Sequence, residues 1–74
     1  MSIEKFIEQF TELFEDSGEL TAQTCFKELP EWNSLMALSV LAMVDEEYDV
    51  SLKGQDIQNA STIEELFKTV EAKK

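Results

Sequence analysis

Apolar residues recur at helical spacing in the first fifteen residues of the chain. They fall at i, i+3, i+4, i+7, i+10 and i+11, with acidic residues on the opposite side. These apolar positions are Ile3, Phe6, Ile7, Phe10, Leu13 and Phe14. The pattern predicts an amphipathic helix from about Ile3 to about Glu15, with Ser2 as its N-cap. The residues expected to end it are Asp16, Ser17 and Gly18.

The segment 16–33 shows no sustained period, and a connection of this length in a compact domain is commonly functional. A short helical turn near Thr21–Phe26 is compatible with its sequence. Pro30 keeps the chain from being helical just before the next element, because the residue ahead of a proline is pushed toward extended geometry. The side chains expected to pin the segment to a core are Leu20, Phe26, Leu29 and Trp32.

A second apolar stretch begins at Ser34 and predicts a helix that ends near Glu47. Its expected core stripe consists of Leu35, Leu38, Leu41, Ala42 and Val44. Three further apolar residues widen the surface beyond one stripe, so the helix either is central or meets a partner. These residues are Met36, Val40 and Met43. Met36 lies off the stripe, and we expect it to be exposed partner surface.

The C-terminal third contains a connector at 49–53, one or two helical turns at 55–60 and a final helix. The short element requires packing of Ile57 to be stable. Thr62 with Glu65, and Ser61 with Glu64, match the spacing of a capping box. The stripe of the final helix consists of Ile63, Leu66, Phe67 and Val70, and a frayed tail is expected at Glu71–Lys74.

Together these elements predict an all-α fold. We expect a small four-helix bundle with three longer helices, one short helix and a long loop between helices one and two. The expected organisation is a single domain over residues 1–74. At 43% hydrophobic residues the chain is too apolar for a disordered acidic tail, so we expect it to fold alone.

The formal net charge of −10 restricts the partners, and residues 1–52 carry twelve acidic but only two basic groups. Such a field disfavours nucleic acid and anionic membrane surfaces and favours basic protein surfaces. No secretory signal is expected at Met1. The longest uncharged run has 13 residues, which is too short for a membrane span. Cys25 has no second cysteine to pair with, which fits a reducing compartment. We therefore expect a cytoplasmic monomer.

Self-contained catalysis is not expected, so we predict that the chain is not an enzyme. It has no histidine, one cysteine and two glycines. Histidine-based triads, thiolate metal cages and glycine-rich phosphate loops are therefore excluded. Ser34 remains as a candidate, because the start of a helix favours a phosphate group. A serine at such a position is most often only a helix cap, and its hydroxyl needs an external base to react.

The run Asn33-Ser34-Leu35 and the residues after it resemble the acyl carrier protein family, in which an Asp-Ser-Leu motif opens helix two. The matching residues further along that helix are Leu38, Leu41, Asp45, Glu46, Glu47 and Tyr48. The likeness continues through Val50, Leu52, Asp56, Ile57, Ser61, Thr62, Ile63, Leu66 and Val70. It covers about residues 3–72.

This resemblance implies a freestanding carrier protein. Ser34 would receive 4'-phosphopantetheine from coenzyme A through a separate magnesium-dependent phosphopantetheinyl transferase, with Asn33 and Leu35 flanking the attachment site. The thiol of the arm, and not Cys25, would hold acyl intermediates as thioesters for enzymes of fatty-acid or polyketide type. The residues assigned to partner enzymes with basic docking surfaces are Met36, Asp45, Glu46, Glu47, Asp49 and Ile57. The acidic residues among them fit a solvated helix end equally well.

The sequence also departs from the family. Asn33 replaces the usual Asp, which preserves capping but removes a negative charge, and Met36 and Ser39 replace residues that are often acidic. The changes at Met36 and Ser39 favour a polyketide-type or specialised biosynthetic pathway. Ile57 and Ala60 fit either the mouth of an acyl-holding cleft or ordinary core. Trp32 is expected to be a hydrophobic anchor and Cys25 a small buried thiol, both structural.

A second hypothesis is an acidic helical adaptor. In that case Ser34 stays unmodified, and helix two binds a basic partner protein.

Overall fold

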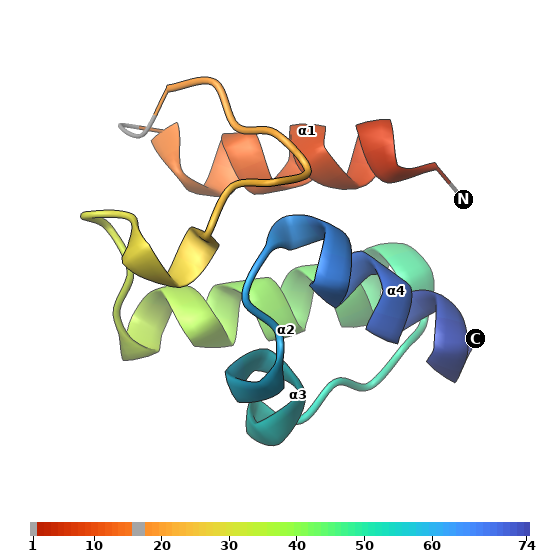
Figure 1. Ribbon diagram of the computed structural model, residues 1–74. Helices are drawn as coiled ribbons and strands as arrows, with labels where there is room; N and C mark the ends of the chain where they lie inside the picture. Colours follow the sequence, from red (N-terminus) through yellow and green to blue (C-terminus); the bar gives the residue numbers. More distant parts are fainter. Residues whose placement is uncertain (1, 16–17) are drawn as a thin grey trace.

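The computed structural model describes residues 2–15 and 18–74. Within these ranges the fold is all-α, as predicted, with three longer helices, one short helix and a long first connection. The helices are α1 (Ile3–Leu13), α2 (Ser34–Tyr48), α3 (Gly54–Asn59) and α4 (Ile63–Lys73), and a 3₁₀ helix covers Phe26–Glu28. α1 and α2 pack side by side in opposite directions, α4 packs against α1, and α3 packs against α4 (Figure 1). No helix of the described ranges has both the length and the apolar character needed to cross a bilayer.

The boundaries of α1 confirm its predicted start. The Ser2 hydroxyl accepts a hydrogen bond from the Lys5 backbone N–H at 3.3 Å, so Ser2 is the N-cap. The helix ends at Leu13, slightly before the predicted end. Asp16 and Ser17, which were expected to end it, lie outside the described residues. Gly18 adopts φ +76°, a left-handed conformation that glycine tolerates because it has no Cβ.

Aromatic side chains form the centre of the core. All five Phe, the single Trp and the single Tyr belong to one connected cluster, in which neighbouring ring centroids lie 5.1 to 6.2 Å apart. Phe6 contacts Tyr48 of α2 and Phe67 of α4, and Phe10 contacts Phe26 of the long connection. The cluster therefore joins every longer helix and the connection.

The core face of α2 differs from the predicted stripe. Val40, Val44 and Tyr48 are buried, whereas Leu35 is 73% exposed and Leu38 is 61% exposed. Ala42 of the predicted stripe is exposed as well, so the prediction that Leu35, Leu38 and Ala42 face the core is wrong. The first eleven residues of α2 are apolar on nearly all sides, so the spacing alone does not identify the buried face. The face is fixed by the i, i+4, i+8 series that ends at Tyr48, whose ring lies 5.6 Å from that of Phe6.

The long connection is tied to the start of α4. Backbone N–H groups in the first turn of a helix lack acceptors within the helix. Here Ile63 donates to the Thr24 carbonyl at 3.2 Å, and Glu64 donates to the Ala22 carbonyl at 3.0 Å. Leu20 and Phe26 are buried, and Leu29 and Trp32 pack against the core, as predicted. The expected helical turn is a turn at residues 22–23 followed by the 3₁₀ helix.

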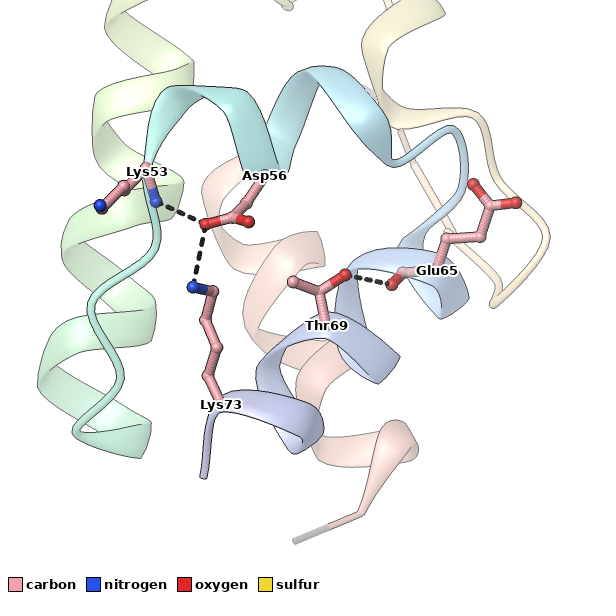
Figure 2. Close-up of polar contacts among 5 residues, drawn as sticks. All are labelled: Lys53, Asp56, Glu65, Thr69 and Lys73. Carbon is pink, nitrogen blue, oxygen red and sulfur yellow. Dashed lines mark hydrogen bonds and ion pairs between the residues drawn. The ribbon is translucent and has the colours of Figure 1, made fainter.

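α3 has only six residues and depends on contacts with its surroundings. Ile57 is buried as predicted, at 4% exposure. The Asp56 carboxylate accepts a hydrogen bond from the Lys53 backbone N–H at 2.9 Å and pairs with the Lys73 ammonium at 3.5 Å (Figure 2). The end of α4 thus lies against the start of α3.

The two ends of α4 differ in part from the predicted ones. The Thr62 hydroxyl caps the helix by accepting the Glu65 N–H at 3.2 Å, but the Glu65 carboxylate accepts the Ser61 N–H, at 2.6 Å, and not that of Thr62. The predicted fraying over Glu71–Lys74 is wrong, because the helix continues through Lys73. The Lys73 ammonium suits the negative end of the helix dipole and also reaches Asp56.

Candidate functional site

Ser34 is the first residue of α2 and not its cap. The backbone of Asn33 is extended, and its Oδ1 accepts the Met36 N–H at 2.8 Å, so Asn33 is the N-cap. Ser34 is exposed, and its hydroxyl makes no hydrogen bond to any described residue. The interpretation of Ser34 as only a cap is therefore wrong. A solvent-facing hydroxyl lies at the positive end of the α2 dipole.

Trp32 holds the chain just before Ser34. Its ring stacks on Phe14, with centroids 6.2 Å apart and an interplanar angle of 4°, and meets Phe26 edge-on at 5.2 Å. Its backbone N–H donates to the Leu29 carbonyl at 3.0 Å. Trp32 is thus the predicted structural anchor, and it fixes the point at which the chain enters α2.

A depression of about 390 Å³ lies beside Ser34. Its apolar lining comes from Trp32, Ala37, Leu41 and Ile57. The structure therefore brings Ile57 close to Ser34, across a space between α2 and α3. Ala60, the other residue considered for a cleft mouth, is 3% exposed and belongs to the core. An attached group at Ser34 has an apolar hollow next to it.

Lys27 also lines this depression, and sequence reasoning did not find it. Its ammonium donates to the Gln58 backbone carbonyl at 2.8 Å and so links the long connection to α3. Carbonyls in the last turn of a helix lack intrahelical partners, and a cation there also interacts favourably with the negative end of the helix dipole. The one available signal is that Lys27 and Lys5 are the only basic residues among the first 52.

The surface on the other side of Ser34 is apolar. Leu35 and Leu38 are exposed, although most large apolar residues of the described chain are buried or half-buried. Met36 was expected to be exposed, but it is half-buried, packs against the core and lines a second depression together with Asn33 and Leu35. The leucines, and not the methionine, form the apolar surface next to Ser34.

The acidic residues assigned to partner binding lie at the far end of α2. Asp45 is about 16 Å along the helix from Ser34, at 1.5 Å per residue. All four of these residues are exposed, namely Asp45, Glu46, Glu47 and Asp49. The acidic residues and Ser34 therefore lie at opposite ends of α2 and do not form one continuous site.

One of these acidic side chains, that of Glu47, has a structural contact. The Gln9 side-chain Nε2 donates to the Glu47 carboxylate at 2.9 Å, and the Tyr48 hydroxyl donates to the Gln9 side-chain Oε1 at 2.6 Å. Burial raises the pKa of the Tyr48 hydroxyl, and the charge of Glu47 raises it further. Asp49 ends α2 in a left-handed conformation with φ +56°. The side chains of Asp45, Glu46 and Asp49 make no hydrogen bond or ion pair within the described ranges.

Cys25 is exposed, so the prediction of a buried thiol is wrong. The next residue, Phe26, fills the core in its place. The Glu28 carboxylate accepts a hydrogen bond from the thiol and raises the pKa of Cys25, as do, to a lesser degree, desolvation and the nearby negative charges. A thiol with a raised pKa is a poor nucleophile at neutral pH.

Comparisons with protein-family models, curated proteins and solved structures return no match for this chain. Its function is therefore inferred from its own residues and their arrangement.

Proposed function

We propose that the protein is an acyl carrier that holds acyl intermediates as thioesters on a 4'-phosphopantetheine arm attached to Ser34. The observation that carries the proposal is the exposed Ser34 hydroxyl in the first turn of α2, which is left without a capping role because Asn33 supplies the cap. The resemblance of Asn33-Ser34-Leu35 and the rest of helix two to the acyl carrier protein family supports the same conclusion.

The residues around Ser34 suit an attached phosphodiester. Anions are stabilised at a helix N-terminus, where backbone N–H groups face outward. In the attachment step the Ser34 Oγ forms a bond to phosphorus, and the phosphoanhydride bond of coenzyme A breaks to release adenosine bisphosphate. The hydroxyl proton passes to a base that the transferase supplies, because the chain has no histidine and no side chain of the described residues is hydrogen-bonded to the Ser34 hydroxyl. Ser34 is thus the acceptor of the group, and the transferase supplies the catalysis.

The proposal assigns different tasks to the two ends of α2. The N-terminal end holds the arm, beside the depression lined by Ile57 and the exposed side chains of Leu35 and Leu38. The acidic C-terminal end speeds encounters with partner enzymes that carry basic surfaces. We place this activity in the cytoplasm. We also place it in a specialised pathway, because Met36 and Ser39 stand near Ser34 at positions that are often acidic in the acyl carrier protein family.

A second candidate function is an unmodified adaptor that binds a basic protein through α2. The exposure of Leu35 and Leu38 favours it, because exposed apolar side chains grouped on one helix commonly mark a protein interface. In this case Ser34 has no covalent partner.

Intact-mass spectrometry separates the two candidates. The purified chain is incubated with coenzyme A, magnesium and a broad-specificity phosphopantetheinyl transferase. The carrier hypothesis predicts a single adduct with the mass of one phosphopantetheine group, which Ser34→Ala abolishes. Ser39→Ala is the matched control, because Ser39 lies in the same helix and its hydroxyl donates to the Leu35 carbonyl at 3.1 Å. If the wild-type chain gains no mass, the carrier hypothesis is rejected and the adaptor hypothesis remains.

A further inference from the structure

The depression of about 390 Å³ beside Ser34 differs in charge from other hollows of the described surface. Four other depressions are each lined by at least one glutamate. The depression beside Ser34 has no acidic residue in its lining and one basic residue, Lys27. Most of its lining comes from the 3₁₀ helix, the first half of α2 and α3 (Figure 1). This space, which we call the Ser34 depression, is therefore cationic and partly apolar in a chain of net charge −10.

The Lys27 ammonium is held in place without being neutralised. It donates to the Gln58 backbone carbonyl at 2.8 Å, and an ammonium has further N–H donors beyond the one used here. No ion pair between Lys27 and a carboxylate is present in the described ranges. A cation that is fixed before binding loses less conformational freedom when an anion pairs with it. Lys27 is therefore prepared to accept a negatively charged group.

We propose that Lys27 makes the Ser34 depression selective for acyl groups that end in a carboxylate. This inference rests on the proposed attachment of the arm to Ser34, and it names the class of cargo. The loaded end of a flexible arm folds back into the depression, where the aliphatic part of the cargo packs against Leu41 and Ile57. The terminal carboxylate then pairs with the Lys27 ammonium. The volume of about 390 Å³ lies within the range of about 300–1,000 Å³ that is typical of small-molecule sites.

The charge of the whole chain explains why such a cargo needs a cation. A carboxylate-bearing acyl group is repelled by a molecule of net charge −10, and burial of an unpaired carboxylate is unfavourable. A charge-assisted hydrogen bond from Lys27 offsets both effects. An acyl group that ends in a methyl group gains nothing from the ammonium. The phosphodiester at Ser34 is already stabilised by the free backbone N–H groups at the start of α2, so the Lys27 ammonium remains for the cargo.

The test compares two cargoes by NMR on the isotope-labelled full chain. The transferase attaches arms that carry a hexanoyl or an adipoyl group, joined by an amide in place of the thioester to prevent hydrolysis. The two acyl groups have the same length, but only adipoyl ends in a carboxylate. Relative to the arm without cargo, we expect adipoyl to shift the side-chain signals of Lys27 and the backbone amides at residues 57–59. If the arm without cargo shifts the Lys27 signals as much as adipoyl does, the ammonium binds the phosphodiester and the proposal is overturned.

Matched variants identify the charge of Lys27 as the cause. Lys27→Met should lower the ratio of docked to undocked adipoyl about fivefold, as expected for a partly exposed ion pair, and should change hexanoyl docking less than about twofold. Lys27→Arg keeps the charge and should keep most of the adipoyl docking. The control Lys68→Met makes the same charge change at an exposed position that lines none of the five depressions, and its effect should be less than about twofold. Equal losses with both cargoes in Lys27→Met would show that Lys27 only holds α3, and would overturn the proposal.

A salt titration of the wild-type chain gives a test that does not depend on the folding of a variant. Added salt should weaken adipoyl docking about threefold and leave hexanoyl docking unchanged, because only the former includes an ion pair. Adipoyl docking that is insensitive to salt would contradict the proposal.

The mass of the wild-type chain separates the two possible failures. If the chain gains no mass, the carrier function is rejected, and this inference with it. If the chain is fully loaded but the Lys27 signals respond equally to hexanoyl and adipoyl, selection for a carboxylate is rejected and the carrier function stands.

Discussion

The buried face of α2 can be tested by comparing Val40→Ala with Leu38→Ala. Val40 is fully buried, and its truncation removes two methyl-sized groups, each worth about 0.8 kcal/mol of burial. The cavity left behind adds up to about 1 kcal/mol, and the higher helix propensity of alanine offsets about 0.5 kcal/mol. We therefore expect a loss of about 1.5–2 kcal/mol in the free energy of unfolding. Leu38 is 61% exposed, and its truncation should cost less than about 0.5 kcal/mol.

Thermal unfolding followed by circular dichroism measures both effects. In a domain of this size 1 kcal/mol corresponds to about 4–8 °C. Val40→Ala should therefore lower Tm by about 6–16 °C and Leu38→Ala by less than about 4 °C. The reasoning is refuted if Leu38→Ala destabilises the chain as much as Val40→Ala, since Leu38 would then face the core. A stable Leu38→Ala variant is also the reagent with which to measure the contribution of that side chain to partner binding.

Two further predictions concern the C-terminal end of α2. Asp49→Val should lower the free energy of unfolding by about 1–2 kcal/mol, because a β-branched residue is strained at φ +56°. Asp49→Asn should keep the free energy of unfolding within about 0.5 kcal/mol of the wild type while removing the charge. If urea unfolding shows that Asp49→Val and Asp49→Asn lose the same free energy of unfolding, this account is contradicted. Because the pKa of Tyr48 is raised, the folded chain holds the phenolic proton more tightly than the unfolded chain, so stability falls as the pH rises above about 10. Urea unfolding across this pH range should show a fall in the free energy of unfolding that the Tyr48→Phe variant lacks. If the difference in free energy of unfolding between the two proteins stays constant with pH, the prediction is disproved.

The features of the site differ in how far local sequence could reveal them. Asn33 was predicted to preserve the cap of α2, and it does, because N-capping involves residues only three positions apart. The contact of Lys27 with the Gln58 carbonyl joins positions 31 residues apart, and no local pattern encodes it. The exposure of Cys25 was not predicted. The next residue, Phe26, is larger and more apolar, and it occupies the core position instead.

The sequence by itself determined the number, order and approximate bounds of the helices. Those properties follow from the spacing of apolar residues and from capping residues, which act within a few positions. The buried sides of α1 and α4 were also correct, since each has one apolar stripe opposite charged residues.

Only the tertiary structure decided which side of α2 is buried. α2 is apolar around most of its surface, so several orientations bury similar apolar area and periodicity cannot choose among them. The choice is made by distant partners, chiefly the aromatic contacts that place Tyr48 against Phe6 and Trp32 against Phe14. That orientation leaves Ser34, Leu35 and Leu38 facing solvent, because the core has room for only one face of the helix.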